Sequence, residues 1–368
     1  MAADLDGLDS AALAELDPHD HAAAVALAAA RVRQTSTVAH ESDLSRVHED
    51  GRPRAVLVVA RGVAALAARA WVATCGVAGP VVLAVAHPDE LPGWAGPVDL
   101  VIAATGGDDP LVAAALEQAV RRGSHVAAIA GARSSLADVA EQGRGTLVGI
   151  PPTPPGLELW TVLSALAVVG DAANVAPSPP VTLETAATTL EDLARRCHPS
   201  AESFVNPAKA IAHDVGGTLP LVFGDGAVAG AAADRFAERL AAAGLAAVPG
   251  VLPDALTMRG ALLEQNLGSR SSTDADDFFR DRVGDVDALP RHLVLLQDAQ
   301  LSAALDETRS LAHAGGVGVA ELPAEPGPAL ARYAAHAGLA DWVGFYVALA
   351  NGRDPALTAG TERTPLPA

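Results

Sequence analysis

The sequence contains little positive charge and almost no lysine. Lys209 is the only lysine, and 25 lysine and arginine residues stand against 44 acidic residues, for a net charge of −19. Nucleic-acid binding depends on basic side chains that neutralise phosphates, so this balance argues against a nucleic-acid partner. A mechanism that needs a lysine as base or Schiff-base nucleophile has only Lys209 to use.

Cysteine and aromatic residues are also scarce. Cys75 and Cys197 lie far apart, and the sequence contains no Cys-x-x-Cys pair or histidine–cysteine cluster. This excludes a disulfide framework and a zinc-ribbon site, so we expect no metal or other cofactor and a reducing, cytoplasmic location. Aromatics make up 3% of the chain while half of it is apolar. That composition predicts a core of alanine, valine and leucine around buried parallel strands.

Long apolar segments are absent as well. The longest, residues 159–170, is shorter than the ~20 residues that a membrane-spanning helix needs. The first ten residues, MAADLDGLDS, are acidic and lack the apolar core of a signal peptide. We therefore expect a soluble protein that has no membrane partner.

Short apolar runs alternate with alanine-rich stretches along most of the chain. Runs without polar–apolar alternation are typical of strands buried on both faces, and the stretches between them predict the crossover helices that parallel strands require. The expected strands are residues 55–60, 81–86, 99–104, 125–130, 146–150, 220–224, 245–250, 292–297 and 317–322. The expected helices include residues 10–34, 109–122, 157–173, 182–197 and 328–351.

Two proline-rich segments, residues 151–156 and 176–180, interrupt this alternation. We expect an N-terminal subdomain with a leading helix over residues 1–175 and a C-terminal subdomain over residues 176–368. A chain of 368 residues suits two domains of ordinary size. The predicted fold class is α/β, with two doubly wound subdomains that each contain a mainly parallel sheet flanked by helices.

One charged segment has no clear period. Residues 266–291, NLGSRSSTDADDFFRDRVGDVDALPR, are mainly polar and charged. They are either a loop or lid over a site or a solvated insertion.

Four segments carry a resemblance to a known family. Residues 104–131, ATGGDDPLVAAALEQAVRRGSHVAAIAG, resemble the sugar isomerase (SIS) signature, in which a Ser/Thr-rich turn opens a helix and holds a sugar phosphate. Residues 203–238 resemble an Asn-Pro-Ala-Lys helix, a strand ending in Tyr-Gly and a helix with an Arg-Trp pair. Residues 16–32 and 333–355 resemble the family's opening and closing helices. In this order they resemble the bifunctional phosphoglucose/phosphomannose isomerase family, which implies two SIS-type subdomains, a homodimer and a phosphorylated hexose.

The resemblance places a sugar phosphate beside the turn at residues 105–109. Thr105 and Gly106 match the Ser-Gly of the signature, and Gly107 matches its Asn. Asp108 replaces the next Thr, and a carboxylate repels phosphate. The same residues also suit a plain helix start in which Asp108 or Asp109 complements the helix dipole.

Three further positions follow from the resemblance. Arg61 and Gly62 fall in the second phosphate-binding turn, where a glycine remains and the family's hydroxyl is missing. Arg61 would supply a charge-assisted contact to phosphate instead, although an arginine beside a strand end also suits a solvated surface position. Arg235 matches the arginine of the Arg-Trp pair, and we expect it to contact the substrate.

The groups that would perform isomerisation are not at their expected positions. The reaction needs a base that moves a proton between C1 and C2 and an acid that opens the ring. The family's glutamate falls on the alanines of residues 241–243, its histidine falls within residues 257–259, and the tail after Pro355 contains no lysine. The catalytic residues therefore stay unassigned. Arg363, the nearest cation in the tail, is a poor proton donor.

Two hypotheses remain open. The chain is either a SIS protein that binds a sugar phosphate and has lost or weakened isomerase activity, or an active glucose-6-phosphate/mannose-6-phosphate isomerase with displaced catalytic groups. His213, Glu238, Glu264 and His336 are candidate substitutes.

Two other motifs have simpler explanations. The glycine spacing of GDGAVAG, residues 224–230, is one residue too long for a dinucleotide fingerprint. DPHDH, residues 17–21, could hold a metal, but Asp17 and Pro18 are also typical of a helix start.

Overall fold

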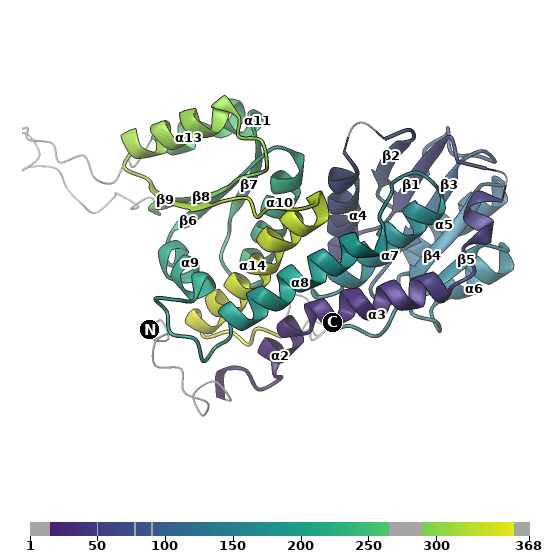
Figure 1. The fold of residues 1–368 in the computed structure, drawn as a ribbon, viewed down its shortest axis with the longest axis horizontal. Helices are drawn as coiled ribbons and strands as arrows, with labels where there is room; N and C mark the ends of the chain where they lie inside the picture. The colour runs from purple at the N-terminus through teal and green to yellow at the C-terminus, as the bar shows by residue number, and fades with distance from the viewer. Residues whose placement is uncertain (1–14, 50, 77–78, 90, 265–288, 357–368) are drawn as a thin grey trace, which may run out of the picture.

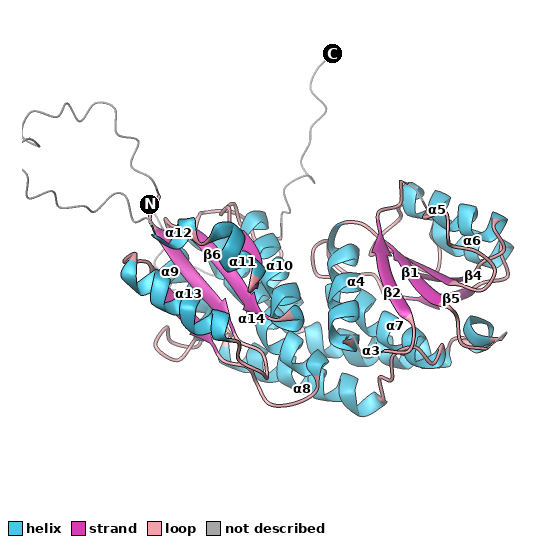
Figure 2. Ribbon diagram, turned by 90° about the horizontal axis from the view of Figure 1, so that it is seen from above, coloured by secondary structure: helices cyan, strands magenta, loops and turns pink. Residues whose placement is uncertain are grey.

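The computed structural model describes residues 15–49, 51–76, 79–89, 91–264 and 289–356. Two parallel β-sheets lie toward opposite ends of an elongated molecule, and helices fill the space between them (Figure 1, Figure 2). This confirms the predicted α/β class with two parallel sheets flanked by helices. No helix within these ranges is long and apolar enough to cross a membrane. The charged stretch 266–291 lies, as far as residue 288, outside them.

The first sheet has the strand order β2-β1-β3-β4-β5, and all neighbouring strands are parallel. The strands are β1 (Ala55–Val59), β2 (Val82–Ala86), β3 (Leu100–Ala104), β4 (His125–Ala130) and β5 (Thr146–Gly149). Successive side chains point to opposite faces. Val56 and Ile102 belong to the core shared with α3 (Ala28–Glu41), α4 (Gly62–Cys75) and α7 (Leu159–Ala172). Leu57 and Val101 pack instead against α5 (Pro110–Arg121) and α6 (Ser135–Gln142).

The second sheet has the order β7-β6-β8-β9 and is also parallel. Its strands are β6 (Leu219–Asp225), β7 (Val248–Leu252), β8 (Arg291–Leu296) and β9 (Gly318–Leu322). One face packs against α9 (Pro207–Val215), α10 (Ala227–Ala242) and α14 (Ala329–Ala350). The other packs against α11 (Asp254–Arg259), α12 (Ala261–Glu264) and α13 (Ala303–Ala314).

The expected strands all form, with one clear shift. The run at residues 245–250 predicts a strand that starts earlier than β7, because Leu245 to Ala247 are apolar. In the structure these residues follow the end of α10 and precede the strand. Pro249 lies inside β7 and is tolerated because β7 is the edge strand of its sheet.

The first described helices are shorter than the single helix expected over residues 10–34. The chain forms α2 (His21–Ala26), passes Leu27, and continues as α3 and then as a 3-10 turn, η1 (Ser45–His48). The N-cap of α2 is Asp20 rather than Asp17, but the carboxylate of Asp17 accepts the backbone amides of His21 and Ala22 at 2.7 and 2.8 Å and so still serves the start of this helix.

Helices from both ends of the molecule share one apolar core. Trp71 on α4, Phe236 on α10 and Phe345 on α14 belong to the same buried cluster. The long helix α8 (Pro180–Arg196) crosses between the two sheets and packs against α3 and α14 (Figure 1). The subdomain boundary between residues 175 and 176 stays a prediction, since buried apolar contacts cross it.

Candidate functional site

The candidate site is the topological switch point at the carboxyl ends of β1 and β3, called the crevice below. After β1 the chain enters α4 on one face of the sheet, and after β3 it enters α5 on the other face. Such a switch in direction opens the crevice in which open α/β sheets bind ligands. The structure brings the five predicted residues of the N-terminal half together here, since Arg61 and Gly62 follow β1 and residues 105–107 follow β3.

The turn after β1 presents an open helix N-terminus. Arg61 is the N-cap residue of α4 in an extended conformation, and its side chain makes no capping hydrogen bond. Gly62 has φ of +58°, a left-handed conformation that favours glycine, and a Cβ there would have no atom within 4 Å. The first amides of the 14-residue helix therefore have no side-chain cap. Their partial positive charge attracts anions.

Arg61 reaches across the crevice to the other turn. Its Nε lies 3.2 Å from Oδ2 of Asp109, and the Arg61 side chain is 48% exposed. Asp109 is also the N-cap of α5, where Oδ1 accepts the amides of Leu111 and Val112 at 3.1 and 3.4 Å. The helix-start interpretation thus holds for Asp109. Asp109, on the opposite side of the crevice, is thus the ion-pair partner of Arg61.

Thr105, Gly106 and Gly107 form a compact turn at the end of β3. Thr105 is buried, and its hydroxyl accepts the amide of Gly107 at 3.2 Å. A Cβ at Gly106 would overlap the side chain of Glu158, so this glycine permits a close approach. Gly107 is exposed, and a Cβ there would meet nothing within 4 Å.

Asp108 turns toward the neighbouring helix. Its Oδ1 accepts the hydroxyl of Ser135 at 2.6 Å and the amide of Ser135 at 3.0 Å, at the start of α6. These hydrogen bonds lower the pKa of Asp108. The carboxylate therefore stays ionised, and it remains an unfavourable neighbour for a phosphate.

Sequence reasoning missed one residue of this site, Glu158. It directly precedes α7, and its side chain lies against the turn at Gly106. Its Oε2 is buried and has no hydrogen-bond partner among the residues described. The only sequence signal is its place just after the proline-rich segment 151–156, which says nothing about the crevice.

Arg235 belongs to a buried ion network rather than to the turns after β1 and β3. It is fully buried on α10, and its guanidinium donates to Asp341 Oδ1 through Nε at 2.9 Å and through Nη2 at 2.6 Å. Nη2 also donates to the carbonyl oxygen of Gly156 at 2.7 Å, and Nη1 to Glu238 at 2.5 Å. A substrate contact by Arg235 stays a prediction; in this structure the side chain ties α10 to α14 and to the segment before α7.

The candidate catalytic substitutes do not gather at the crevice. Glu238 is paired with Arg235, and His336 is buried on α14 with Nε2 2.8 Å from the carbonyl oxygen of Gln297. His213 on α9 and Glu264 at the end of α12 are exposed beside the second sheet. The described residues contain no group of three His, Cys, Asp or Glu side chains that could hold a metal ion.

The corresponding strand ends of the second sheet carry two acidic residues that are engaged in internal contacts. Asp225 at the end of β6 is buried and accepts the amide and hydroxyl of Ser302 at 2.8 and 2.6 Å. Asp298 pairs with Arg332 at 2.6 Å. Two carboxylates at this end make it a poor place for a phosphate.

Comparisons with known proteins agree with this architecture. Residues 204–363 match the family model of the bacterial phospho-glucose isomerase C-terminal SIS domain. A comparison with curated proteins gave no match.

Several solved structures share the fold. A hypothetical protein from Thermus thermophilus has a TM-score of 0.65 at 12% identity, covering 95% of this chain and 90% of its own. A candidate phosphosugar isomerase from Clostridium difficile 630 has 0.62 at 9%, covering 92% and 95%. The C-terminal domain of glucosamine-fructose-6-phosphate aminotransferase from Francisella tularensis has 0.54 at 12%, covering 95% and 98%. Residues 204–363 therefore match a SIS domain of the bacterial phospho-glucose isomerase type, and the chain as a whole shares the fold of these solved structures.

Proposed function

We propose that this protein binds a phosphorylated hexose in the crevice between β1 and β3. The observation that carries the proposal is the turn after β1, where α4 begins without a side-chain cap and its N-cap residue, Arg61, supplies an exposed guanidinium. A phosphate at this turn would accept from helix amides and from Arg61, which would exchange Asp109 for the ligand. The exposed Gly107 leaves the other side open for the sugar.

We further propose that isomerase activity is lost or weakened. The two acidic residues of the β3–α5 turn already have partners, because Asp108 binds Ser135 and Asp109 binds Arg61 and caps α5. The family's base and acid positions hold no carboxylate, histidine or lysine. A crevice without a free acid–base pair can hold a sugar phosphate but lacks the groups that move protons between C1 and C2. The role would then be to sense or sequester the ligand.

Glu158 favours the alternative, an active isomerase with displaced catalytic groups. Its carboxylate has an oxygen without a partner in the described part of the chain and lies against the Thr105–Gly107 turn. A base needs an oxygen that can accept a proton, and the buried Oε2 would have to become accessible to the substrate carbon. Glu158 is therefore the residue to test first for residual catalysis.

Binding is tested by thermal shift with glucose 6-phosphate and fructose 6-phosphate, beside glucose and inorganic phosphate. A ligand that prefers the native state raises its stability by mass action. Arg61→Gln should lower the affinity by about tenfold or more, as expected for loss of a charged phosphate contact. Arg69→Gln is the matched control, because Arg69 lies on the same helix with a side chain 49% exposed. Absence of any shift at millimolar sugar phosphate would contradict the binding proposal.

Catalysis is tested separately, by incubation with fructose 6-phosphate in heavy water and NMR of the C1 and C2 protons. We expect no deuterium incorporation above a blank without protein. Incorporation that disappears in Glu158→Gln would establish the alternative.

Two wider expectations belong to the same proposal. The family resemblance supports a homodimer, and the small number of cysteines supports a cytoplasmic location. Sedimentation analysis of the full chain should give a dimer mass, and a monomer at micromolar concentration would refute the first of these.

A further inference from the structure

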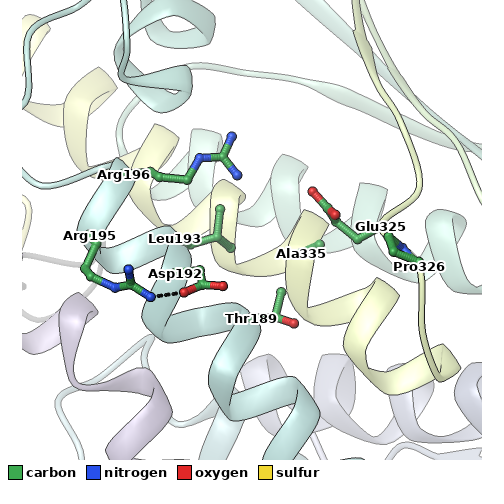
Figure 3. A pocket seen from close by; sticks show the side chains of 8 residues that line it. All are labelled: Thr189, Asp192, Leu193, Arg195, Arg196, Glu325, Pro326 and Ala335. Atoms are coloured by element: carbon green, nitrogen blue, oxygen red, sulfur yellow. Dashed lines mark hydrogen bonds and ion pairs between the residues drawn. The ribbon is translucent and has the colours of Figure 1, made fainter.

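A second pocket lies between α8 and the start of α14, with a volume of about 370 Å³ (Figure 3). Its walls come from the last turns of α8, from residues 325–326 and from Ala335. None of these residues belongs to the crevice between β1 and β3. The volume falls within the range of small-molecule sites.

The two arginines at the end of α8 differ in their partners. Arg195 pairs with Asp192 three residues earlier. Arg196 projects toward Glu325 from the opposite wall, and Figure 3 shows the two charged groups facing one another across the pocket. Neither forms an ion pair or hydrogen bond with any residue in the described ranges. The guanidinium of Arg196 and the carboxylate of Glu325 are therefore too far apart to pair directly, and a ligand could lie between them.

The rest of the pocket is neutral or apolar. The Arg195–Asp192 pair carries no net charge, and the Thr189 hydroxyl donates to the carbonyl oxygen of Thr185 at 3.0 Å. Leu193 and Ala335, which are both buried, form the apolar part of the wall. The pocket therefore has a cationic side, an anionic side and apolar surface between them.

We propose that this pocket binds a small zwitterion, with its anionic group on Arg196 and its ammonium group on Glu325. A guanidinium matches a carboxylate through two parallel hydrogen bonds, and a carboxylate accepts from an ammonium group. The apolar surface suits the short alkyl chain that separates the two charges. A ligand with a single charge would pair with only one of these two side chains and would leave the other without a partner.

The test uses the full chain and a series of ω-amino acids: glycine, β-alanine, γ-aminobutyrate and ε-aminocaproate. Butyrate and butylamine serve as analogues with one charge each. Calorimetry or ligand-detected NMR should show that one member of the series binds about three- to fivefold more tightly than both analogues, which is the gain expected from one added exposed charge contact. The series also reports the distance between the two charged groups.

Substitutions connect the binding to the two walls. Arg196→Gln and Glu325→Gln should each reduce the affinity to that of a one-charge analogue, and the charge-exchanged double variant should recover part of it, because a zwitterion can bind in the reverse direction. Arg121→Gln on α5, also an exposed helical arginine, is the control and should have no effect. If no member of the series exceeds the analogues, or if binding persists in both single variants, the proposal is refuted.

Discussion

Asp341 is the carboxylate on which a buried ion network depends. It is 1% exposed on α14 and accepts from two nitrogens of Arg235, at 2.9 and 2.6 Å, and from Trp160 Nε1 at 2.9 Å. Arg239 Nε is 3.9 Å away, and burial and the neighbouring Arg235 lower the pKa of Arg239. In Asp341→Asn, the buried guanidinium groups of Arg235 and Arg239 would keep only Glu238 as an ion-pair partner among the described residues.

The expected cost of Asp341→Asn is about 3–5 kcal/mol of unfolding free energy, because the substitution removes one partner of a buried pair and leaves the other charge uncompensated. Asp306→Asn is the matched control. Asp306 also pairs with an arginine, Arg309 at 2.6 Å, but its side chain is 78% exposed. An exposed pair contributes about 0–1 kcal/mol.

The assay is urea unfolding of both variants and the parent chain, followed by circular dichroism and by tryptophan fluorescence, since Trp160 shares the network. Asp341→Asn should move the midpoint far to lower urea, whereas Asp306→Asn should leave it nearly unchanged. Equal midpoints for the two variants would refute the view that the buried carboxylate holds α10, α14 and α7 together. An Asp341→Asn chain that fails to fold would support it.

Two further changes test the packing and the electrostatics. Gly224→Ala should destabilise the fold by about 1–3 kcal/mol or more, because the added Cβ would overlap the backbone of Ala229. Gly107→Ala, with open space around the Cβ, is the control in the same urea assay. Burial, followed by the charge of Arg239, lowers the pKa of His21 to about 4 from 6.5. As the pH falls, His21 is therefore protonated in the unfolded chain before it is protonated in the folded one. The free energy of unfolding should decrease by about 1.4 kcal/mol per pH unit between pH 6.5 and about pH 4. His21→Gln should remove this part of the slope, and an unchanged slope would contradict the assignment.

The strands and the first crevice could be predicted from the sequence because both depend on local pattern. Buried parallel strands appear as continuous apolar runs, and the loops after them are where ligands bind. Arg61 and Thr105 could therefore be assigned to one end of a sheet from the sequence alone. The position of β7 was less exact, because the apolar residues before Val248 are typical of a strand although they lie in the connection after α10.

The buried network could not be predicted because its partners are distant in the chain. Arg235 and Asp341 are 106 positions apart, and Trp160 and Asp341 are 181 apart. Nothing near Arg235 in the sequence distinguishes an arginine that binds substrate from one that is buried with a carboxylate. Glu158 was missed for the same reason, because Gly106, which its side chain contacts in space, lies about 50 residues earlier, in the turn after β3.

The single lysine gives the protein a built-in chemical reporter. Lys209 is 3% exposed, and its Nζ donates to the carbonyl oxygens of Pro199 and Ala201 at 3.0 and 2.9 Å while lying 5.7 Å from the centre of the Tyr346 ring. An amine-reactive reagent can reach it only when α9 separates from the segment 199–201 or from α14. The rate at which Lys209 becomes acylated, separated from acylation of the α-amino group by peptide mapping, would thus measure local opening at one known position, because the chain has no other lysine.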